Sequence, residues 1–372
     1  MNSTIYNIPK TIFLIGLPLA SMIGVPLYVY QNGVVWQEPA MLLIGWFFAG
    51  LGITVGYHRL FAHRSFKAKP LTEWFIMFIS TAALQNKIVN WCSDHRRHHR
   101  MLDTKQDPYS ITEGFFHAHI GWIMKKTPTI IEGVEDLQKK SCVKFQSRFY
   151  WPLAISLCFL LPVVIGSLYG RPLGGFLWGG ILRVTLVHHF TYFINSLCHY
   201  AGTKPYDVNT TARDSWYMAL LTFGEGYHNF HHKFQWDYRN GIRWYDFDPS
   251  KWFIKTLSYF RLTYDLKKVQ ESRILKARFD CLSEQVTSIL NERSSITYKK
   301  YLTRLDEANA KVKSYMKSWR ELEKEASKIN VLESIPGKIN QINSLRLQYK
   351  IKMNGAINSL SVILVSLKDN LV

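Results

Sequence analysis

The chain has 372 residues, of which 47% are hydrophobic and 15% aromatic, and its formal net charge is +19. Long apolar runs with many aromatic residues indicate a membrane protein, and the positive charge then belongs at the cytosolic surface of the membrane. No nucleic-acid-binding motif accompanies this charge, so we expect no nucleic-acid partner. The five cysteines are scattered without a C-x-x-C pair, which argues against a disulfide scaffold or a thiolate zinc site.

Four apolar runs predict transmembrane helices, because a helix of about 20 apolar residues crosses a bilayer. The predicted spans are about residues 11–31, 38–58, 151–170 and 174–198. The first run is longer than the apolar region of a signal peptide and no cleavage pattern follows it, so we expect it to remain in the protein. Lys and Arg are concentrated in residues 58–150 and 199–372, which places these segments and both termini in the cytosol by the positive-inside rule.

The apolar stretch from Pro70 to Gln85 is too short for a span and contains Glu73. A crossing here would place the histidines before and after it on opposite sides of the membrane. We therefore expect a helix that lies in the membrane interface or packs against a cytosolic cap. The expected fold class is all-α, an integral membrane protein with four transmembrane helices and a cytosolic helical cap.

Eight of the thirteen histidines fall in three short clusters. Two clusters have the spacing H-x-x-H-H, which brings three imidazoles to one face of an α-helix, and one has the spacing H-x4-H. The clustered residues are His58 and His63, then His95, His98 and His99, and finally His228, His231 and His232. Eight neutral nitrogens are too many for one zinc ion and suit two transition-metal ions. Because the clusters lack the carboxylates of soluble di-iron bundles, we predict a histidine-rich dimetal site.

Polar residues near the clusters are further candidates. Asp94 and Glu225 are placed to accept hydrogen bonds from ring N–H groups or to contact substrate, and an ion pair with Arg96 is the alternative for Asp94. Asn195 and His199 lie at i and i+4 at the end of the fourth predicted span. A polar pair that faces a bundle interior is a candidate for function, and a hydrogen bond between helices is the alternative.

Residues 266–372 differ from residues 1–265 in being rich in Lys and Glu with few aromatics, and we expect them to form a helical extension of the membrane domain. Apolar residues in the extension alternate steps of three and four, as in a heptad stripe. They are Tyr298, Tyr301, Leu305, Ala308, Val312, Tyr315, Trp319, Leu322, Ala326 and Ile329. A helical hairpin packed on itself or on the cap is one interpretation. An intermolecular coiled coil, which would make the protein an oligomer, is the other.

The motifs HRLFAH, DHRRHH and GYHNFHH, with NSLCH before the last, resemble those of the membrane fatty-acid desaturases, and most of all the acyl-CoA delta-9 (stearoyl-CoA) type. The resemblance covers about residues 10–270. It implies two iron ions held by nine histidines, with Asn195 near one iron through water, and O2 as co-substrate. The implied ligands are His58, His63, His95, His98, His99, His199, His228, His231 and His232. The implied reaction leaves a cis double bond in a saturated acyl chain.

The resemblance also implies substrate contacts. It places Gln85, Asn86 and Trp91 near the bend of an apolar acyl tunnel, although Trp91 equally suits ordinary packing. It maps coenzyme A contacts onto Asn86, Asp94 and the basic pair Lys125–Lys126, which also suits anionic lipid. Family members of the acyl-CoA type commonly carry Arg where this chain has Ser93, and the departure weakens acyl-CoA relative to a lipid-bound or carrier-bound acyl group.

The haem-binding HPGG motif of a fused cytochrome b5 module does not occur in the sequence. We therefore expect electrons from a separate ferredoxin or cytochrome b5 with its reductase. The C-terminal helices are hypothesised to dock that donor or to form an oligomer. The lack of a fused donor and the short termini favour a bacterial inner membrane over the endoplasmic reticulum.

The predicted function is that of a fatty acyl desaturase. The alternatives are a di-iron membrane hydroxylase or monooxygenase, which would insert oxygen at a similar centre, and an acyl-lipid desaturase. A non-enzymatic membrane scaffold is the remaining alternative, and the intact set of histidines argues against it.

Overall fold

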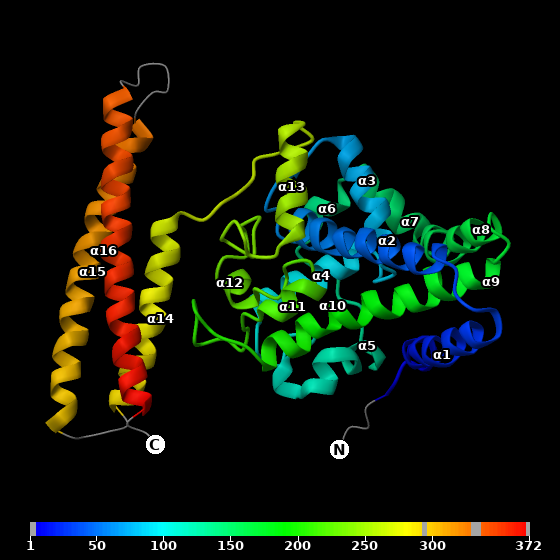
Figure 1. Cartoon of the computed structure of the whole chain (residues 1–372), viewed down its shortest axis with the longest axis horizontal. Coiled ribbons are helices and arrows are strands. Elements are labelled where there is room, and N and C mark those ends of the chain that lie inside the picture. The colour runs from blue at the N-terminus through cyan, green and yellow to red at the C-terminus, as the bar shows by residue number, and fades with distance from the viewer. Residues whose placement is uncertain (1–4, 292–295, 329–335, 370–372) are drawn as a thin grey trace. The chain divides into compact units, whose positions relative to one another are not determined.

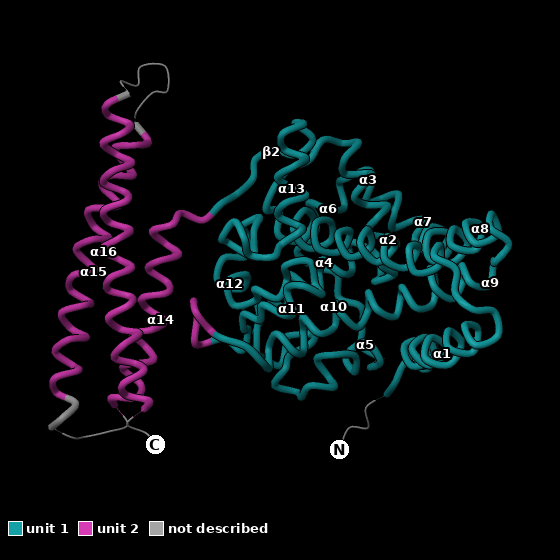
Figure 2. The backbone as a smooth tube through the Cα atoms, in the orientation of Figure 1, with its two compact units in different colours: residues 1–203, 210–268 teal, residues 204–209, 269–372 magenta. Residues whose placement is uncertain are grey.

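The computed structural model of the chain describes residues 5–291, 296–328 and 336–369. These residues are mostly helical, which confirms the predicted class, and they divide into two units. The first unit comprises residues 1–203 and 210–268, and the second comprises residues 204–209 and 269–372 (Figure 2).

The first unit consists of helices joined by loops, with two short strands that pair antiparallel, β1 (Lys67–Ala68) and β2 (Thr263–Tyr264). Four of its helical segments, named η1 and η3 to η5, are π-helical, and η2 is a 3-10 turn. In chain order the helical segments are α1 (Ile8–Asn32), α2 (Gln37–Leu51), η1 (Gly52–Ala62), α3 (Pro70–Thr81), α4 (Ile88–Arg100), η2 (Ile111–Glu113), η3 (His117–Gly121), α5 (Trp122–Met124), α6 (Glu135–Gln138), α7 (Ser141–Ile155), η4 (Ser156–Leu160), α8 (Leu161–Ser167), α9 (Pro172–Gly174), η5 (Gly175–Leu182), α10 (Arg183–Tyr200), α11 (Trp216–Leu221), α12 (His228–Lys233) and α13 (Pro249–Tyr259).

Within the described residues, three helical stretches are long and apolar enough to cross a membrane, namely Ile8–Asn32, Gln37–Ala62 and Ser141–Ser167. They coincide with the first three predicted spans, but the third begins ten residues earlier than predicted because α7 already starts at Ser141. That helix bends at Phe149, where φ is −109°. The bend occurs because Pro152 has no N–H to donate to the preceding turn and its ring crowds the backbone of that turn. The fourth predicted span lies in the continuous helical run α9–η5–α10, and its crossing of the membrane stays a prediction.

The helix α3 packs closely on the backbone of η1. A Cβ atom at Gly52 would lie 2.5 Å from the backbone carbon of Ile79, and one at Gly56 would lie 2.1 Å from Oγ of Ser80. The Ser80 hydroxyl donates to the carbonyl of Gly52 at 2.7 Å. One face of α3 is thus fixed on protein, while Leu71 on the other face is 82% exposed.

The main core of the first unit lies among η1, α3, α4 and α7, and it surrounds the helices that carry the first two histidine clusters. Its fully buried members are apolar and include Val55, Phe61, Ile76, Met77, Ile88, Cys92 and Val143. This packing makes η1 and α4 rigid supports for the side chains described below.

The second unit contains three long helices, α14 (Glu271–Asn291), α15 (Ile296–Lys328) and α16 (Pro336–Asp369), which pack side by side (Figure 1). The predicted apolar stripe lies on α15, where its residues Leu305, Val312, Trp319 and Leu322 are buried. Their partners in the same chain include Phe279 on α14 and Met353 and Leu360 on α16. Residues of the stripe thus pack on both neighbouring helices of the same chain, while the side chain of Tyr298 and all of Ile329 lie outside the described residues.

Candidate metal centre

Nine histidines from distant parts of the first unit gather into two groups, and within each group the candidate ligand atoms lie within 4.8 Å of one another. They are the eight clustered histidines together with His199. Group 1 contains His58, His63, His95, His99 and His231. Group 2 contains His98, His199, His228 and His232. No ring in either group is exposed, so water has little access to these nitrogens.

The π-helical geometry of η1 explains the H-x4-H spacing. A π-helix pairs residue i+5 with residue i, so such residues stand one above the other. The backbone N–H of His63 donates to the carbonyl of His58 at 3.0 Å, and the two ring centroids are 4.6 Å apart. A regular α-helix would point the two rings in different directions, whereas η1 delivers both to group 1.

The two H-x-x-H-H clusters lie on short helices, α4 and α12, and each cluster divides between the groups. On α4, His95 and His99 belong to group 1, and His98 belongs to group 2. On α12, His228 and His232 belong to group 2, and His231 belongs to group 1. In both helices the residues at i and i+4 share a group and the residue at i+3 enters the other group.

The spacing of the ring nitrogens fits bound metal ions. Nε2 of His231 lies 3.0 Å from Nε2 of His58 and 3.0 Å from Nε2 of His99. In group 2, Nε2 of His228 lies 3.0 Å from Nε2 of His199 and of His232. Two nitrogens held about 2.1 Å from one ion at right angles would be about 3.0 Å apart. The donor set therefore has the spacing of adjacent ligands around a cation.

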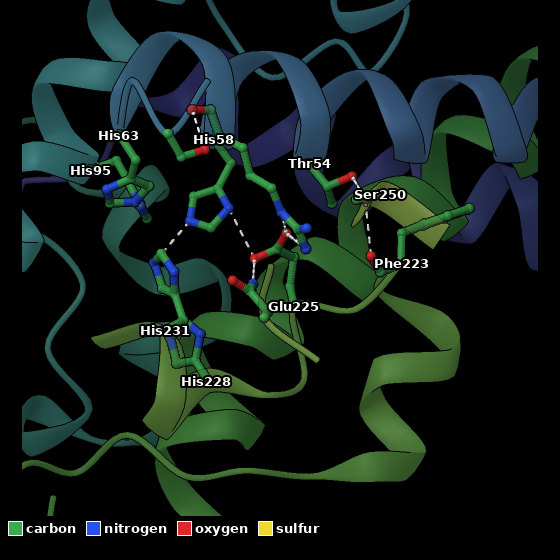
Figure 3. Close-up of polar contacts among 12 residues, drawn as sticks. Thr54, His58, His63, His95, Phe223, Glu225, His228, His231 and Ser250 are labelled. Carbon is green, nitrogen blue, oxygen red and sulfur yellow. Dashed lines mark hydrogen bonds and ion pairs between the residues drawn. The ribbon is translucent and has the colours of Figure 1, made fainter. Parts of the chain in front are cut away.

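A carboxylate contact at the other ring nitrogen orients His58 toward group 1. Nδ1 of His58 lies 2.9 Å from Oε2 of Glu225, as Figure 3 shows, so the proton sits on Nδ1 and a lone pair remains on Nε2. Arg59 and Asn240 also donate to Glu225, at 3.0 and 2.6 Å. Although burial alone would raise it, contact with His58 and Arg59 lowers the pKa of Glu225 to about 2. Glu225 thus has the outer position predicted for it.

The loop that follows α4 orients two further rings. Nδ1 of His98 lies 2.8 Å from Oδ1 of Asp107, and Nδ1 of His95 lies 3.1 Å from the hydroxyl of Tyr109. Burial raises the pKa of Asp107 to about 7, so a cation on the far side of His98 would favour its charged form. Sequence spacing did not indicate either residue, because both lie in a loop without a repeating pattern.

Group 2 receives a third support through Thr211. Nδ1 of His199 lies 2.8 Å from Oγ1 of Thr211, and this hydroxyl donates to Oδ1 of Asp103 at 2.6 Å. The backbone N–H of Thr211 donates to the other oxygen of the same carboxylate at 2.9 Å. Thr211 can therefore accept the proton of His199 and leave Nε2 free to bind a metal. Neither Thr211 nor Asp103 was predicted.

Burial favours the neutral form of seven of the clustered rings. Desolvation, followed by the effect of neighbouring rings, lowers the pKa well below 6.5 for His63, His95, His98, His99, His228, His231 and His232. Neutral imidazole is the form that binds metal ions. The site is therefore ready to ligate a cation at neutral pH.

Of the residues proposed for the acyl bend, Trp91 contacts rings of group 1. The Trp91 ring stacks on that of His95, with centroids 4.8 Å apart. Nε2 of Gln85 donates to Oγ1 of Thr191 at 2.8 Å. Thr191 also lines a small pocket whose walls are largely apolar. Its other lining residues include Trp46, Ile53, Val187, Phe190 and Phe223.

The residues proposed for coenzyme A are not joined to one another. Asp94 accepts from Arg97 at 2.6 Å rather than from Arg96, and Lys125 donates to Glu113 at 2.8 Å. Among the described residues, no hydrogen bond or ion pair links Asp94 or Asn86 to Lys125 or Lys126. The side chains of Asn86 and Lys126 are exposed.

Ser93 has a structural role in the position where Arg is common. Its hydroxyl contacts the carbonyls of Ile130 and Glu132 at 3.1 and 3.2 Å, and it accepts from the N–H of Glu132 at 2.9 Å. It fixes the segment before α6 on α4.

Two residues of α10 near the site have different surroundings. Asn195 is partly buried one turn before His199. His188 lies outside both groups, and its Nε2 is 3.1 Å from the carbonyls of both Ala83 and Leu84. His188 therefore supports the loop before α4.

Comparison with known proteins adds an independent observation. The family model described as fatty acid desaturase matches residues 35–265, which include all nine histidines. The chain is 41% identical over 265 residues to a probable acyl-CoA desaturase of Schizosaccharomyces pombe, with 70% of this chain and 54% of that protein covered. It is 36% identical to a Delta(9)-fatty-acid desaturase of Caenorhabditis elegans, with coverage of 69% and 78%.

A third relative is the stearoyl-CoA desaturase of Homo sapiens, which is 36% identical with coverage of 62% and 66%. The acyl-CoA desaturase 1 of Saccharomyces cerevisiae is 36% identical, with 71% of this chain and 56% of that protein covered. The chain thus spans about half the length of the two yeast relatives.

Proposed function

This chain belongs to the fatty acid desaturase family, and from that premise we propose that it uses O2 to introduce a cis double bond, at the delta-9 position, into the acyl chain of a fatty acyl-CoA. The observation that carries the proposal is the division of nine histidines, six buried and three half-buried, into two groups with metal-ligand spacing. A non-enzymatic scaffold would have no need to keep so many neutral rings desolvated around two points.

We propose that two iron ions are the metals of this centre. Group 1 would hold one iron, and group 2, with Asn195 acting through water, would hold the other. The pair of ions would supply the oxidation that removes two hydrogen atoms from adjacent methylenes, while O2 with two electrons and two protons becomes two water molecules. The unactivated C–H bonds of an alkyl chain need such an oxidant, because no side-chain base can remove their protons.

The protein's own residues orient the ligands and the substrate. Glu225, Asp107 and Thr211 hold the ring protons on Nδ1, so the lone pairs on Nε2 point inward. The apolar cavity beside Thr191 suits part of the acyl chain, and the hydrogen bond from Gln85 fixes one wall of it. Holding one C–C bond in register beside the metals is what selects a single double-bond position.

The names of the relatives, acyl-CoA and stearoyl-CoA desaturases, support acyl-CoA as the form of the substrate. We propose Asn86, Asp94, Lys125 and Lys126 as contacts of the coenzyme. Lys126 is exposed, and its side chain has no hydrogen bond or ion pair within the described part of the chain, which suits a phosphate contact. An acyl-lipid substrate is the alternative outcome of the substrate assay.

We propose a multi-pass membrane protein with four spans and with both termini and the metal centre in the cytosol. The three long apolar helices support this arrangement. The relatives named above come from eukaryotes, which favours the endoplasmic reticulum over the bacterial inner membrane expected from the sequence. A separate ferredoxin or cytochrome b5 with its reductase would deliver the electrons.

The test is expression of the full chain in a cell that lacks delta-9 unsaturated fatty acids, followed by gas chromatography of total lipid. A new cis-9 alkene that is lost in His98→Ala would support the proposal. A hydroxylated product would assign a monooxygenase instead. Folded, membrane-extracted protein without iron would contradict the metal centre.

A further inference from the structure

The C-terminal helical unit includes six residues from the middle of the chain. Residues 204–209 belong to the second unit, although the residues on both sides of them belong to the first (Figure 2). The family model ends at residue 265, so the three C-terminal helices lie outside the matched region. The six-residue segment, here called the bridging loop, is joined along the chain at both ends to the unit that holds the metal centre.

The bridging loop is attached to α14. Nδ2 of Asn209 donates to Oε2 of Glu284 at 3.1 Å, and the thiol of Cys281 contacts the carbonyl of Lys204 at 3.0 Å. The loop is also held internally, since Nζ of Lys204 donates to the carbonyl of Val208 at 3.2 Å. Tyr206 in its middle is 9% exposed. The loop is thus an ordered part of the C-terminal unit.

The two ends of the bridging loop lie in the first unit and pair with each other. The N–H of Thr203 donates to the carbonyl of Asp214 at 2.9 Å, and the N–H of Asp214 donates back at 2.7 Å. This pair closes the segment that contains the bridging loop. The paired residues on either side of the loop, residue 203 and residues 210–214, are here called the stem; it begins four residues after His199 and includes Thr211. Any displacement of the loop is therefore transmitted by covalent bonds to a short stem beside group 2.

The stem holds three of the four group 2 histidines. Thr211 accepts from Nδ1 of His199, as described above. Oδ1 of Asp214 accepts from the backbone N–H groups of Asn229 and Phe230 at 2.8 and 3.1 Å. These donors lie in the first turn of α12, the helix that carries His228 and His232. Of the group 1 rings, His231 lies on this same helix.

We infer that Thr211 and Asp214 are positioning residues for the metal of group 2, and that the C-terminal helical unit fixes them through the bridging loop. The inference rests on the proposed metal centre and assigns a role to helices outside the matched family region. Loss of the Asn209–Glu284 contact would loosen the stem. It would lower the affinity of group 2 for its metal more than that of group 1.

The test uses the full-length protein in detergent, freed of metal by chelation and titrated anaerobically with Fe²⁺ against a coloured competing chelator. Mössbauer spectra of the iron-57-loaded protein distinguish the two sites. We expect Thr211→Val to weaken one of the two sites by about 10-fold or more, the usual effect of removing an outer hydrogen bond. Thr211→Ser keeps the hydroxyl and should restore the affinity.

The double variant Asn209→Ala/Glu284→Ala should weaken the same site by about 3-fold, as expected for one exposed hydrogen bond. Glu284→Gln keeps an acceptor and should behave as the wild type. The matched control is Lys350→Ala, which breaks an ion pair with Glu271 at 2.6 Å in the same unit. Thermal unfolding of each metal-free variant excludes general loss of folding as the cause.

Equal affinities in the wild type and the double variant, with Thr211→Val impaired, would overturn the role of the C-terminal unit. Unchanged affinities in Thr211→Val would overturn the whole inference while leaving the metal centre in place. Wild-type protein that binds no iron would overturn the proposed function, and the inference with it.

Discussion

Oδ1 of Asp107 lies 2.8 Å from Nδ1 of His98, and the two side chains are only 1% and 2% exposed. A carboxylate in this position holds the ring proton on Nδ1 and increases the basicity of Nε2. The contact joins a loop residue to the one histidine of α4 that belongs to group 2.

Asp107→Asn should reduce the affinity of group 2 for iron by about 10- to 100-fold, because the amide is a weaker acceptor and can turn its N–H₂ toward the ring. Iron content after dialysis against a chelator measures the loss, with about one iron per chain expected to remain. The matched control is Asp94→Asn, since Asp94 is bonded to Arg97 instead of a ring. A similar loss of iron in both variants would contradict the assignment.

His188→Ala should lower stability and leave the metals in place. The variant removes a buried donor that faces the carbonyls of Ala83 and Leu84, and an unpaired buried group costs about 1–3 kcal/mol. Thermal unfolding in detergent should show a lower Tm with two irons still bound, as proposed for the wild type. His98→Ala should show the opposite pattern, with iron lost from group 2. Loss of iron in His188→Ala would place that ring in the metal centre.

The metal-free protein should become less stable as the pH falls below about 6.5. The folded protein lowers the pKa of rings such as His63, His95 and His99, so the unfolded chain binds more protons in this range. Stability rises with pH wherever the unfolded state binds more protons, so it is fully present above 6.5 and is lost as the pH falls. Glu225, with a pKa of about 2, adds a further loss only below about 4.5.

Chemical denaturation of chelated protein between pH 5.5 and 7.5 measures this dependence. Addition of Fe²⁺ at pH 7.5 should raise the unfolding midpoint, because a ligand that binds only the folded state stabilises it. A midpoint that rises on acidification would mean that the rings are charged in the folded protein.

Trp46→Leu should extend the range of accepted acyl chains to longer ones. Trp46 lines the apolar cavity beside Thr191, and its truncation enlarges the space for an alkyl chain. A methylene in an apolar pocket changes the preference by about 10-fold or more, so a competition between two saturated acyl-CoA lengths should show a shift of that order. Leu43→Ala, at an exposed position of the same helix, is the control. An unchanged product distribution would indicate that the acyl chain lies elsewhere.

Much of the site could be predicted from local patterns. The residues of the three clusters were recognisable because helical spacing repeats in sequence, and His199 followed from its place near the end of an apolar run. The apolar stripe of α15 was recognisable for the same reason, and its buried residues Leu305, Val312 and Trp319 face the core of the helical hairpin. The helix that contains the third predicted span begins ten residues before that span, because α7 continues through a charged segment that composition alone assigns to a loop.

The outer hydrogen bonds could not be predicted in the same way. Asp103, Asp107 and Thr211 lie in irregular loops, and their partners become apparent only when segments far apart in the chain meet. Asp94, which directly precedes the second cluster, contacts Arg97 instead of a ring. Closeness in sequence therefore did not identify the acceptor, since the direction of a side chain depends on its turn of the helix.

The sequence by itself determined which residues are able to bind metals, because side-chain chemistry and a period of three to four residues are local properties. Only the tertiary structure decided how those residues are divided. On α4 the rings of His95 and His99 turn to group 1 and that of His98 turns to group 2, and α12 divides its histidines in the complementary way. Rings at i+3 and i+4 leave a helix on opposite sides of the ring at i. The packing of η1, α10 and α12 around α4 therefore determines which nitrogens meet, and two sites form from three clusters.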